Sequence, residues 1–228
     1  MKFTYLLIDL FCIAVPFIFS FHPKLQFYKR WPAFLPACLL TSFFFIAWDI
    51  LFTYQRVWGF NSRYVSGISF WLVPIEEILF FICIPYACVF TYTCLGILIK
   101  KDYFVSYHKI ISYSLIALLI PVAAISYDKI YTFVTFILLA FVIFLFRNQK
   151  FIARFYFTYL IILIPFIIVN GILTGMWIDE EVVWYNNNEN LGIRLFTIPV
   201  EDIFYGMLLI LLNVSGMEWL SRKKGHAI

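Results

Sequence analysis

The sequence predicts an all-α membrane protein with seven transmembrane helices, arranged as two parallel three-helix repeats joined by a linker helix. Three observations support this fold class. Hydrophobic residues make up 64% of the 228 residues and charged residues only 13%, at a mean hydropathy of +0.91, which exceeds what a water-soluble domain needs. Seven segments approach the roughly 20 apolar residues that cross a bilayer. An acidic motif also occurs twice, in matching surroundings.

The seven predicted helices follow one another with short connections. They cover residues 3–21, 31–54, 70–98, 110–127, 130–146, 155–177 and 196–215. The first segment contains Asp9 and Pro16 and lacks a small-residue cleavage site, so it is predicted to be a helix of the protein and not a removable signal peptide. All five cysteines lie within apolar segments, which favours packing, so no metal site is predicted.

The basic residues predict how these helices are oriented. Twelve of the 17 Lys and Arg lie in the first, third and fifth connections and in the tail. These are Lys24, Lys29, Arg30, Lys100, Lys101, Lys109, Arg147, Lys150, Arg154, Arg222, Lys223 and Lys224. The other five are Lys2, Arg56, Arg63, Lys129 and Arg194. The positive-inside rule therefore predicts a multi-pass protein of the inner (cytoplasmic) membrane, with the N-terminus outside and the C-terminus in the cytoplasm. Because these residues are scattered among loops, they indicate contact with lipid and no binding of nucleic acid.

The repeated motif is Pro-x-Glu followed by a second acid. It occurs as Pro74-Ile75-Glu76-Glu77 and as Pro199-Val200-Glu201-Asp202, each within apolar sequence. An ionised carboxylate at the centre of a bilayer helix costs about 2.5–3.5 kcal/mol. Four acids in two matching places therefore indicate a functional site. Proline is tolerated in the first turn of a helix, so each motif is expected to open one.

Each motif ends a longer repeated stretch, 43–81 in the first half and 165–206 in the second. In both, an apolar helix ends near a polar residue, Asp49 or Asn170, and a polar loop leads to the motif. The acids are therefore predicted to lie at a similar depth near the outer face.

This repetition defines the predicted domains. The first three-helix repeat covers 1–99, a linker helix lies within 100–128, and the second repeat covers 129–228. Since an odd number of helices separates the repeats, both have the same direction in the membrane. Loops 55–69 and 178–195 are expected to cover the acids.

Five acids are predicted to be catalytic, and two further residues to orient them or the substrate. The catalytic candidates are Glu76, Glu77, Glu201, Asp202 and Asp49; the orienting candidates are Asn170 and Arg194. Neighbouring residues are about 100° apart on a helix, so only one acid of each motif can face the site, and Glu76 and Glu201 are predicted to do so. The alternative for all four motif acids, Glu76, Glu77, Glu201 and Asp202, is a solvated position at the interface or a cap of their own helices.

Asp49 and Arg194 have open alternatives. Asp49 either joins the cluster or pairs with Arg56 or Arg63. Arg194 is either an interfacial anchor or the counter-ion of Glu201 or Asp202. Asp9, with no acidic counterpart in the second repeat, is interpreted as an interfacial acid. Five tryptophans are predicted to anchor the membrane interface; they are Trp48, Trp58, Trp71, Trp177 and Trp184.

The chemistry expected of such a cluster is proton transfer. Burial and a neighbouring carboxylate favour the neutral form of a carboxyl group, whereas a helix N-terminus favours the ionised form. Burial is expected to prevail for at least one acid. A neutral acid beside a carboxylate is what protonation of an alkene requires. The aromatic content of 22% also suits a carbocation, because aromatic faces attract cations.

At these residues the sequence resembles the membrane-integral lycopene cyclases of bacteria, archaea and fungi, which carry the Pro-x-Glu-Glu/Asp motif twice in separate or fused subunits. The most specific stretches are NGILTG (170–175), VVWYNNNENLGIRLFTIPVEDIFYG (182–206) and WLVPIEEILFF (71–81). The resemblance covers nearly the whole chain and corresponds to the fused form.

What this resemblance implies is a lycopene β-cyclase, an intramolecular lyase or isomerase of carotenoid biosynthesis. A carboxylic acid protonates C2 of a ψ end of lycopene, the C5–C6 double bond attacks the cation at C1, and a carboxylate removes a proton from C6. The products are γ-carotene and then β-carotene, with no redox change. Lycopene enters from the bilayer. No cofactor is expected, since the chain lacks the GxGxxG of flavoprotein cyclases.

Other readings of the sequence stay open at this point. A related cyclase makes ε or γ rings or acts on C50 carotenoids, and ring type depends on which proton is removed. Outside the enzymes, intramembrane acids and repeats also occur in proton-coupled transporters. A retinal protein is disfavoured because residues 196–215 contain no lysine, and a prenyltransferase because no DxxxD or DDxxD motif is present.

Overall fold

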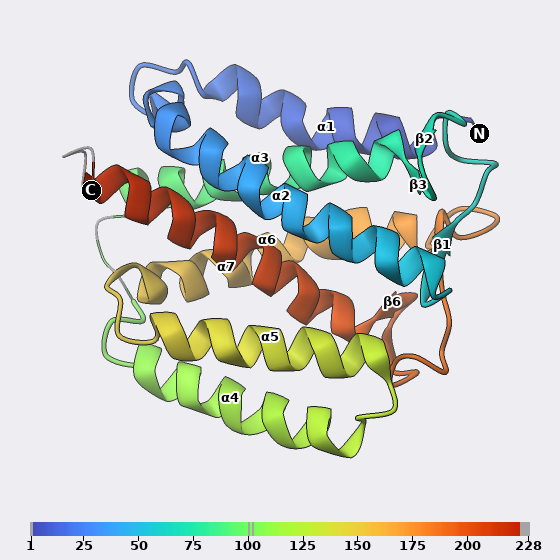
Figure 1. Cartoon of the computed structure of the whole chain (residues 1–228). Helices are drawn as coiled ribbons and strands as arrows, with labels where there is room; N and C mark the ends of the chain where they lie inside the picture. The colour runs from blue at the N-terminus through green and yellow to red at the C-terminus, as the bar shows by residue number, and fades with distance from the viewer. Residues whose placement is uncertain (1, 100, 102, 224–228) are drawn as a thin grey trace.

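The computed structural model describes residues 2–99, 101 and 103–223, so Lys100 and Lys224, which contributed to the orientation prediction, lie outside the described residues. Within the described part, the chain forms a bundle of seven α-helices with three short β pairings at one end (Figure 1). The helices are α1 (Thr4–Phe19), α2 (Trp31–Tyr54), α3 (Ile75–Leu98), α4 (His108–Ile125), α5 (Ile130–Phe146), α6 (Phe151–Leu173) and α7 (Val200–Lys223), with a 3₁₀ turn η1 (Phe27–Arg30) before α2.

The lengths of these helices fit a membrane protein. Five of them are long and apolar enough to cross a bilayer: η1 with α2, then α3, α4, α6 and α7. The other two, α1 and α5, are apolar but shorter, at 16 and 17 residues. The predicted class of all-α membrane protein with seven helices is confirmed for the described residues.

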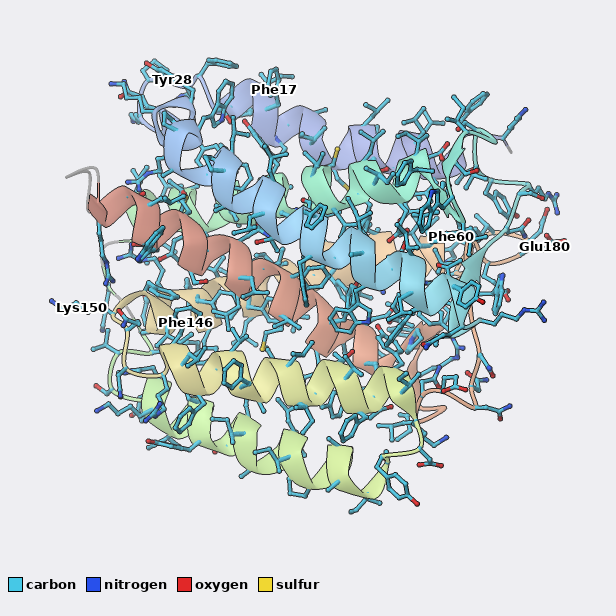
Figure 2. All side chains as sticks on the ribbon, in the orientation of Figure 1. Phe17, Tyr28, Phe60, Phe146, Lys150 and Glu180 are labelled. Carbon is cyan, nitrogen blue, oxygen red and sulfur yellow. The ribbon has the colours of Figure 1, made fainter. Side chains whose placement is uncertain are left out.

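Two repeats of three helices run parallel in the bundle. Helices α1, α3, α5 and α7 all begin at the end that carries the strands, called the motif end below, and α2, α4 and α6 finish there (Figure 1). α4 lies at the edge and packs mainly against α5. Figure 2 shows the side chain of Glu180 at the motif end and that of Lys150 at the opposite end.

The strands connect the repeats and shape their loops. β1 (Trp58–Phe60) pairs antiparallel with β4 (Val183–Tyr185), which joins the two halves. β2 (Ser69–Phe70) pairs with β3 (Val73–Pro74), and β5 (Arg194–Leu195) pairs with β6 (Ile198–Pro199) in the same way. Each of these hairpins ends directly at the start of α3 or α7.

The hairpins explain why two of the predicted helices begin later in the structure, while other predicted ends, such as those of 155–177 against α6, are shifted by a few residues. Residues 70–74 and 196–199 were expected to be helical, but they are strands and turns, with Pro74 as the N-cap of α3. A short apolar run is compatible with either structure. The turn residues Trp71 and Phe196 both have positive φ, at 56° and 58°, which bends each chain back before its helix.

Helix α7 lies at the centre of the bundle and packs against α2, α5, α3 and α6. Its contact with α2 is very close, because a β-carbon added to Gly216 would stand only 2.8 Å from Cβ of Ala37. Small residues permit such close approach of helix backbones in membrane proteins. The pair Ala37 and Gly216 therefore sets the spacing between one helix of each repeat.

Gly216→Ala is expected to lower stability by about 1–3 kcal/mol, since the new methyl group must push α2 and α7 apart. Thermal unfolding in detergent micelles measures the effect. The double variant Ala37→Gly/Gly216→Ala should recover most of the loss, because the added carbon then meets only Cα of residue 37, at 3.6 Å. An unchanged unfolding temperature in the single variant would show that the helices separate without cost.

Candidate active site

The two acidic motifs fold in the same way. The backbone N–H of Ser66 donates to Oε1 of Glu76 at 2.7 Å, and that of Leu191 donates to Oε1 of Glu201, also at 2.7 Å. In both cases the acceptor is the second residue of a helix, and the donor lies ten positions earlier in the chain. The first acid of each motif therefore closes the loop that leads into its own helix.

A glycine follows the donor residue in each loop. Gly67 has φ 93° and Gly192 has φ 70°, a backbone region that residues other than glycine rarely adopt. These two glycines turn the chain so that the preceding N–H points at the helix start. The sequence signal for this loop closure is the shared spacing of glycine, proline and glutamate.

The first acids of the motifs do not line the cavity of the bundle. Glu76 and Glu201 are both wholly buried, and Glu201 also accepts a hydrogen bond of 2.6 Å from Oγ1 of Thr132 on α5. The expectation was that these two residues face the site. The structure differs because their side chains turn back toward the loops, which points the next residue of each helix, Glu77 or Asp202, into the cavity.

A cavity of about 330 Å³ lies between the two repeats. Its acidic and amide residues come from four helix ends at the motif end: Asp49 of α2, Glu77 of α3, Asn170 of α6 and Asp202 of α7. Its aromatic residues near these groups are Tyr5, Trp58, Tyr131, Tyr185 and Tyr205. The structure thus brings together Asp49, Glu77 and Asp202 and leaves Glu76 and Glu201 behind the wall.

Asp202 accepts more hydrogen bonds than the other acids in the cavity. Tyr131 donates to Oδ1 at 2.6 Å, and Asn170 and Tyr185 donate to Oδ2 at 2.7 and 3.0 Å. Burial of the Tyr185 hydroxyl, together with the nearby Asp202 carboxylate, raises the pKa of this phenol well above its usual value, so it stays a donor at ordinary pH. Three donors around one buried carboxyl group favour its ionised form.

Glu77 and Asp49 have fewer donors. Tyr5 of α1 donates to Oε2 of Glu77, as Tyr131 at the start of α5 does to Asp202. Nε1 of Trp58 donates to Oδ1 of Asp49 at 2.6 Å, while Oδ2 of Asp49 is buried without a hydrogen-bond partner among the described residues. Of the two predicted alternatives for Asp49, the structure therefore supports membership of the cluster.

The two halves of the site are similar in shape and unlike in chemistry. Trp58 and Tyr185 are register partners in the β1–β4 pairing, and each donates to an acid of its own half. Asp49, however, occupies in the first half the position that Asn170 occupies in the second, near the end of the middle helix of its repeat. The first half therefore carries two carboxyl groups in the cavity, and the second carries one carboxyl group with an amide beside it.

Asp9 is a buried acid that the sequence analysis placed at the interface. Its side chain is wholly buried, and within the described part of the chain neither oxygen has a hydrogen-bond partner. It lies one helical turn after Tyr5 on α1, which packs against α3, and it interacts electrostatically with Glu77 and Glu76. The interpretation as an interfacial acid is wrong because this face of α1 points into the bundle.

Arg194 lies at the surface and contacts neutral groups. Its guanidinium donates to Oδ1 of Asn187 at 2.9 Å and to the Thr197 carbonyl at 2.7 Å, and it lies 5.9 Å from the ring centroid of Tyr185. It makes no ion pair with Glu201 or Asp202 among the described residues. Among the described residues, Arg194 therefore approaches the site through the ring of Tyr185.

The tryptophans divide into two groups. Trp71, Trp177 and Trp184 are 77%, 73% and 37% exposed, so these three remain available as interface anchors. Trp48 and Trp58 are buried, so the prediction is wrong for these two. The ring of Trp58 lies 5.1 Å from that of Tyr131 and 6.0 Å from that of Tyr205, which builds an aromatic wall beside the acids.

Sequence reasoning missed the tyrosine donors and Trp58. Tyr5 and Tyr131 occupy matching places at the starts of α1 and α5, so the repeat itself contained a signal for them. Across the described residues, no group of three His, Cys, Asp or Glu side chains is arranged to hold a metal ion.

Comparison with known proteins adds one finding. A family model described as "Lycopene cyclase" matches two stretches of the chain, residues 2–95 and 128–220. Each stretch contains one acidic motif and the three helices of one repeat, apart from the last three residues of α3 or α7. Neither the curated proteins nor the solved structures that were compared give a match.

Proposed function

The chain belongs to the lycopene cyclase family, and from this membership we propose that it converts the ψ ends of lycopene into β rings by acid–base chemistry. The observation that supports the proposal most is the single cavity in which Glu77, Asp49 and Asp202 meet. Carotenoid cyclisation needs one group that gives a proton to an alkene and one that takes a proton from carbon. A buried cluster of unequal carboxyl groups supplies both.

We assign the acid role to the Glu77–Asp49 pair and the base role to Asp202. Two buried carboxyl groups with one hydrogen-bond donor each cannot both remain ionised without a large electrostatic cost, so this pair holds a proton. Asp202 accepts three hydrogen bonds, which stabilise its ionised form. Glu76 and Glu201 have a structural role in this proposal, because they anchor the loops and lie outside the cavity.

The proposed reaction is an isomerisation. The proton goes to C2 of the ψ end, which leaves a tertiary cation at C1. The electrons of the C5–C6 double bond form the C1–C6 bond, the cation moves to C5, and Asp202 takes the proton from C6 to restore the double bond. The aromatic wall of Trp58, Tyr131 and Tyr205 stabilises the cation, at about 0.5–2 kcal/mol for each well-placed ring.

The test is pigment analysis of a bacterium that accumulates lycopene, with and without this gene. Loss of lycopene with appearance of γ-carotene and β-carotene by chromatography is the expected result. ε-Ring products would keep the acid step and change the carbon from which the proton is removed. Unchanged lycopene, with the protein present in the membrane, would contradict the proposal.

We also propose that the motif end faces the outside of the inner membrane. Lys24, Lys29, Lys150 and neighbouring basic residues gather at the opposite end of the bundle, and cytoplasmic loops favour Lys and Arg. A maleimide that does not cross membranes should label a cysteine introduced at Glu180 in whole cells but not one introduced at Lys150. The reverse pattern would invert the orientation, and the wild type provides the background of the native cysteines.

A further inference from the structure

The cavity is elongated and extends far from the acids. On α3 its lining residues recur at helical spacing from Glu77 through Ile84 and Ala87 to Thr91. At 1.5 Å per residue, the distance along the helix from Glu77 to Thr91 is about 21 Å. The cavity, of about 330 Å³, thus extends from the acids along the bundle.

The walls of this extension are apolar. They include residues of α1, α3 and α6, namely Cys12, Pro16, Ala87, Thr91, Ile161 and Pro165, which together are called the track below; Leu209 and Ile210 of α7 add to the apolar lining. The only hydroxyl among them, that of Thr91, donates to the Ala87 carbonyl of its own helix at 2.8 Å. The track therefore offers no free polar group to a ligand, in contrast to the acidic end of the same cavity.

The track is also open along its side. Helix α3 packs against both α1 and α6, and the track residues on these three helices are half-buried or, for Pro165, exposed. The surface around them is the apolar surface of helices suited to a bilayer. A long apolar molecule therefore reaches the cavity sideways from lipid, without passing through the polar loops of the motif end.

We propose that the track holds the conjugated chain of the substrate along the bundle axis, so that one ψ end lies at the acids and the other lies toward the opposite end of the bundle. This inference rests on the proposed function and extends it. The acids that line the cavity among the described residues, Asp49, Glu77 and Asp202, all lie at the motif end. Glu218, a buried acid near the opposite end of α7, accepts from Tyr92 and is not part of the lining. Each binding event therefore cyclises one end. The monocyclic product must then leave and return turned end for end before its second ring forms.

The test uses two substrates and a pair of matched variants. Ala87→Phe fills the track about 15 Å along α3 from Glu77, whereas Ala14→Phe adds the same ring on the exposed surface of α1, outside the cavity. The substrates are lycopene and a truncated analogue with the same ψ end but a conjugated chain too short to reach residue 87. Both are assayed with purified protein in detergent.

Ala87→Phe is expected to lower lycopene conversion by about tenfold or more, since a pocket discriminates strongly against a chain it cannot accommodate. Conversion of the truncated analogue should stay within about twofold of wild type, as should both conversions by Ala14→Phe. If Ala87→Phe, and also Ile161→Phe from the opposite wall, lowered conversion of both substrates equally, the proposal that the track holds the conjugated chain would be contradicted. Wild-type conversion of lycopene by Ala87→Phe would contradict the same proposal. Failure of the wild type with both substrates would instead contradict the proposed function.

A second measurement tests whether the monocyclic product leaves and rebinds in the reverse direction before its second ring forms. Labelled lycopene is converted in the presence of excess unlabelled γ-carotene. If the monocyclic product leaves after the first ring, the label in β-carotene is diluted by the added pool. Undiluted label would show that both rings form in one binding event and would overturn the one-end arrangement.

Discussion

Glu77→Gln and Asp202→Asn are each expected to lower lycopene cyclisation by about 10²–10⁴-fold, the usual contribution of a general acid or base. Glutamine has no acidic proton to give to an alkene, and asparagine cannot take a proton from C6. Both replacements have nearly the shape of the original side chain, and each keeps one carbonyl oxygen for the Tyr5 or Tyr131 donor. The measurement is lycopene loss and product formation per amount of purified protein.

The double variant Glu77→Gln/Asp202→Asn distinguishes a joint mechanism from two independent effects. Groups that act as a unit lose nearly all activity when either is removed, so the double variant should be no slower than the slower single variant. Thermal unfolding of all three proteins is the control for folding. A single variant that is folded and retains the wild-type rate would remove that acid from the chemistry.

The repeat and the acidic end of the bundle could be predicted from sequence because they depend on spacing and hydropathy. Two motifs of identical pattern, each after an apolar segment and a polar loop, place Glu77 and Asp202 at the same end of parallel helices. The ranges 31–54 and 130–146 agree with α2 and α5 as observed. These features follow from the length of chain that a bilayer requires.

Which acid of each motif faces the cavity could not be predicted in this way. Adjacent residues on a helix are about 100° apart, so the choice between Glu76 and Glu77 depends on the rotational phase at which the helix begins. That phase is set by the loop, through the hydrogen bond from the Ser66 N–H to Glu76. The pattern alone therefore located the acids to within one residue. In each motif, the residue predicted to face the cavity lies about 100° around the helix from the residue that does.

Asp9 was misplaced for a related reason. The sequence shows an acid near the start of an apolar helix with no acidic counterpart in the second repeat, which is typical of an interfacial position. Tyr5, one turn earlier, is the residue that reveals the inward face of α1, but its role depends on a contact with Glu77 from another helix. Contacts between helices, unlike periodicity within one, are not visible in a single sequence.

Glu201→Gln and Glu201→Ala are expected to differ sharply, in a way that separates loop anchoring from chemistry. Oε1 of Glu201 accepts from the Leu191 N–H and from Thr132, whereas Oε2 has no hydrogen-bond partner among the described residues. Glutamine retains the acceptor at Oε1, so this variant should fold and keep activity within about tenfold of wild type. Alanine leaves the donors of Leu191 and Thr132 unpaired and creates a small void in place of the side chain. It should therefore lower the free energy of unfolding by about 2–5 kcal/mol.

The same comparison at Glu76 is an independent test of loop anchoring in the first half, since Oε1 of Glu76 accepts from the Ser66 N–H in the equivalent loop. Glu76→Gln should resemble wild type, and Glu76→Ala should unfold at a lower temperature and lose activity together with its fold. The decisive contrast is between Glu76→Gln and Glu77→Gln, which make the same chemical change one residue apart. If Glu76→Gln and Glu201→Gln abolish cyclisation while unfolding at the wild-type temperature, the first acids of the motifs carry the proton and Glu77 and Asp202 do not act alone. Retained activity in both, with loss in Glu77→Gln, assigns the reaction to the acids that line the cavity.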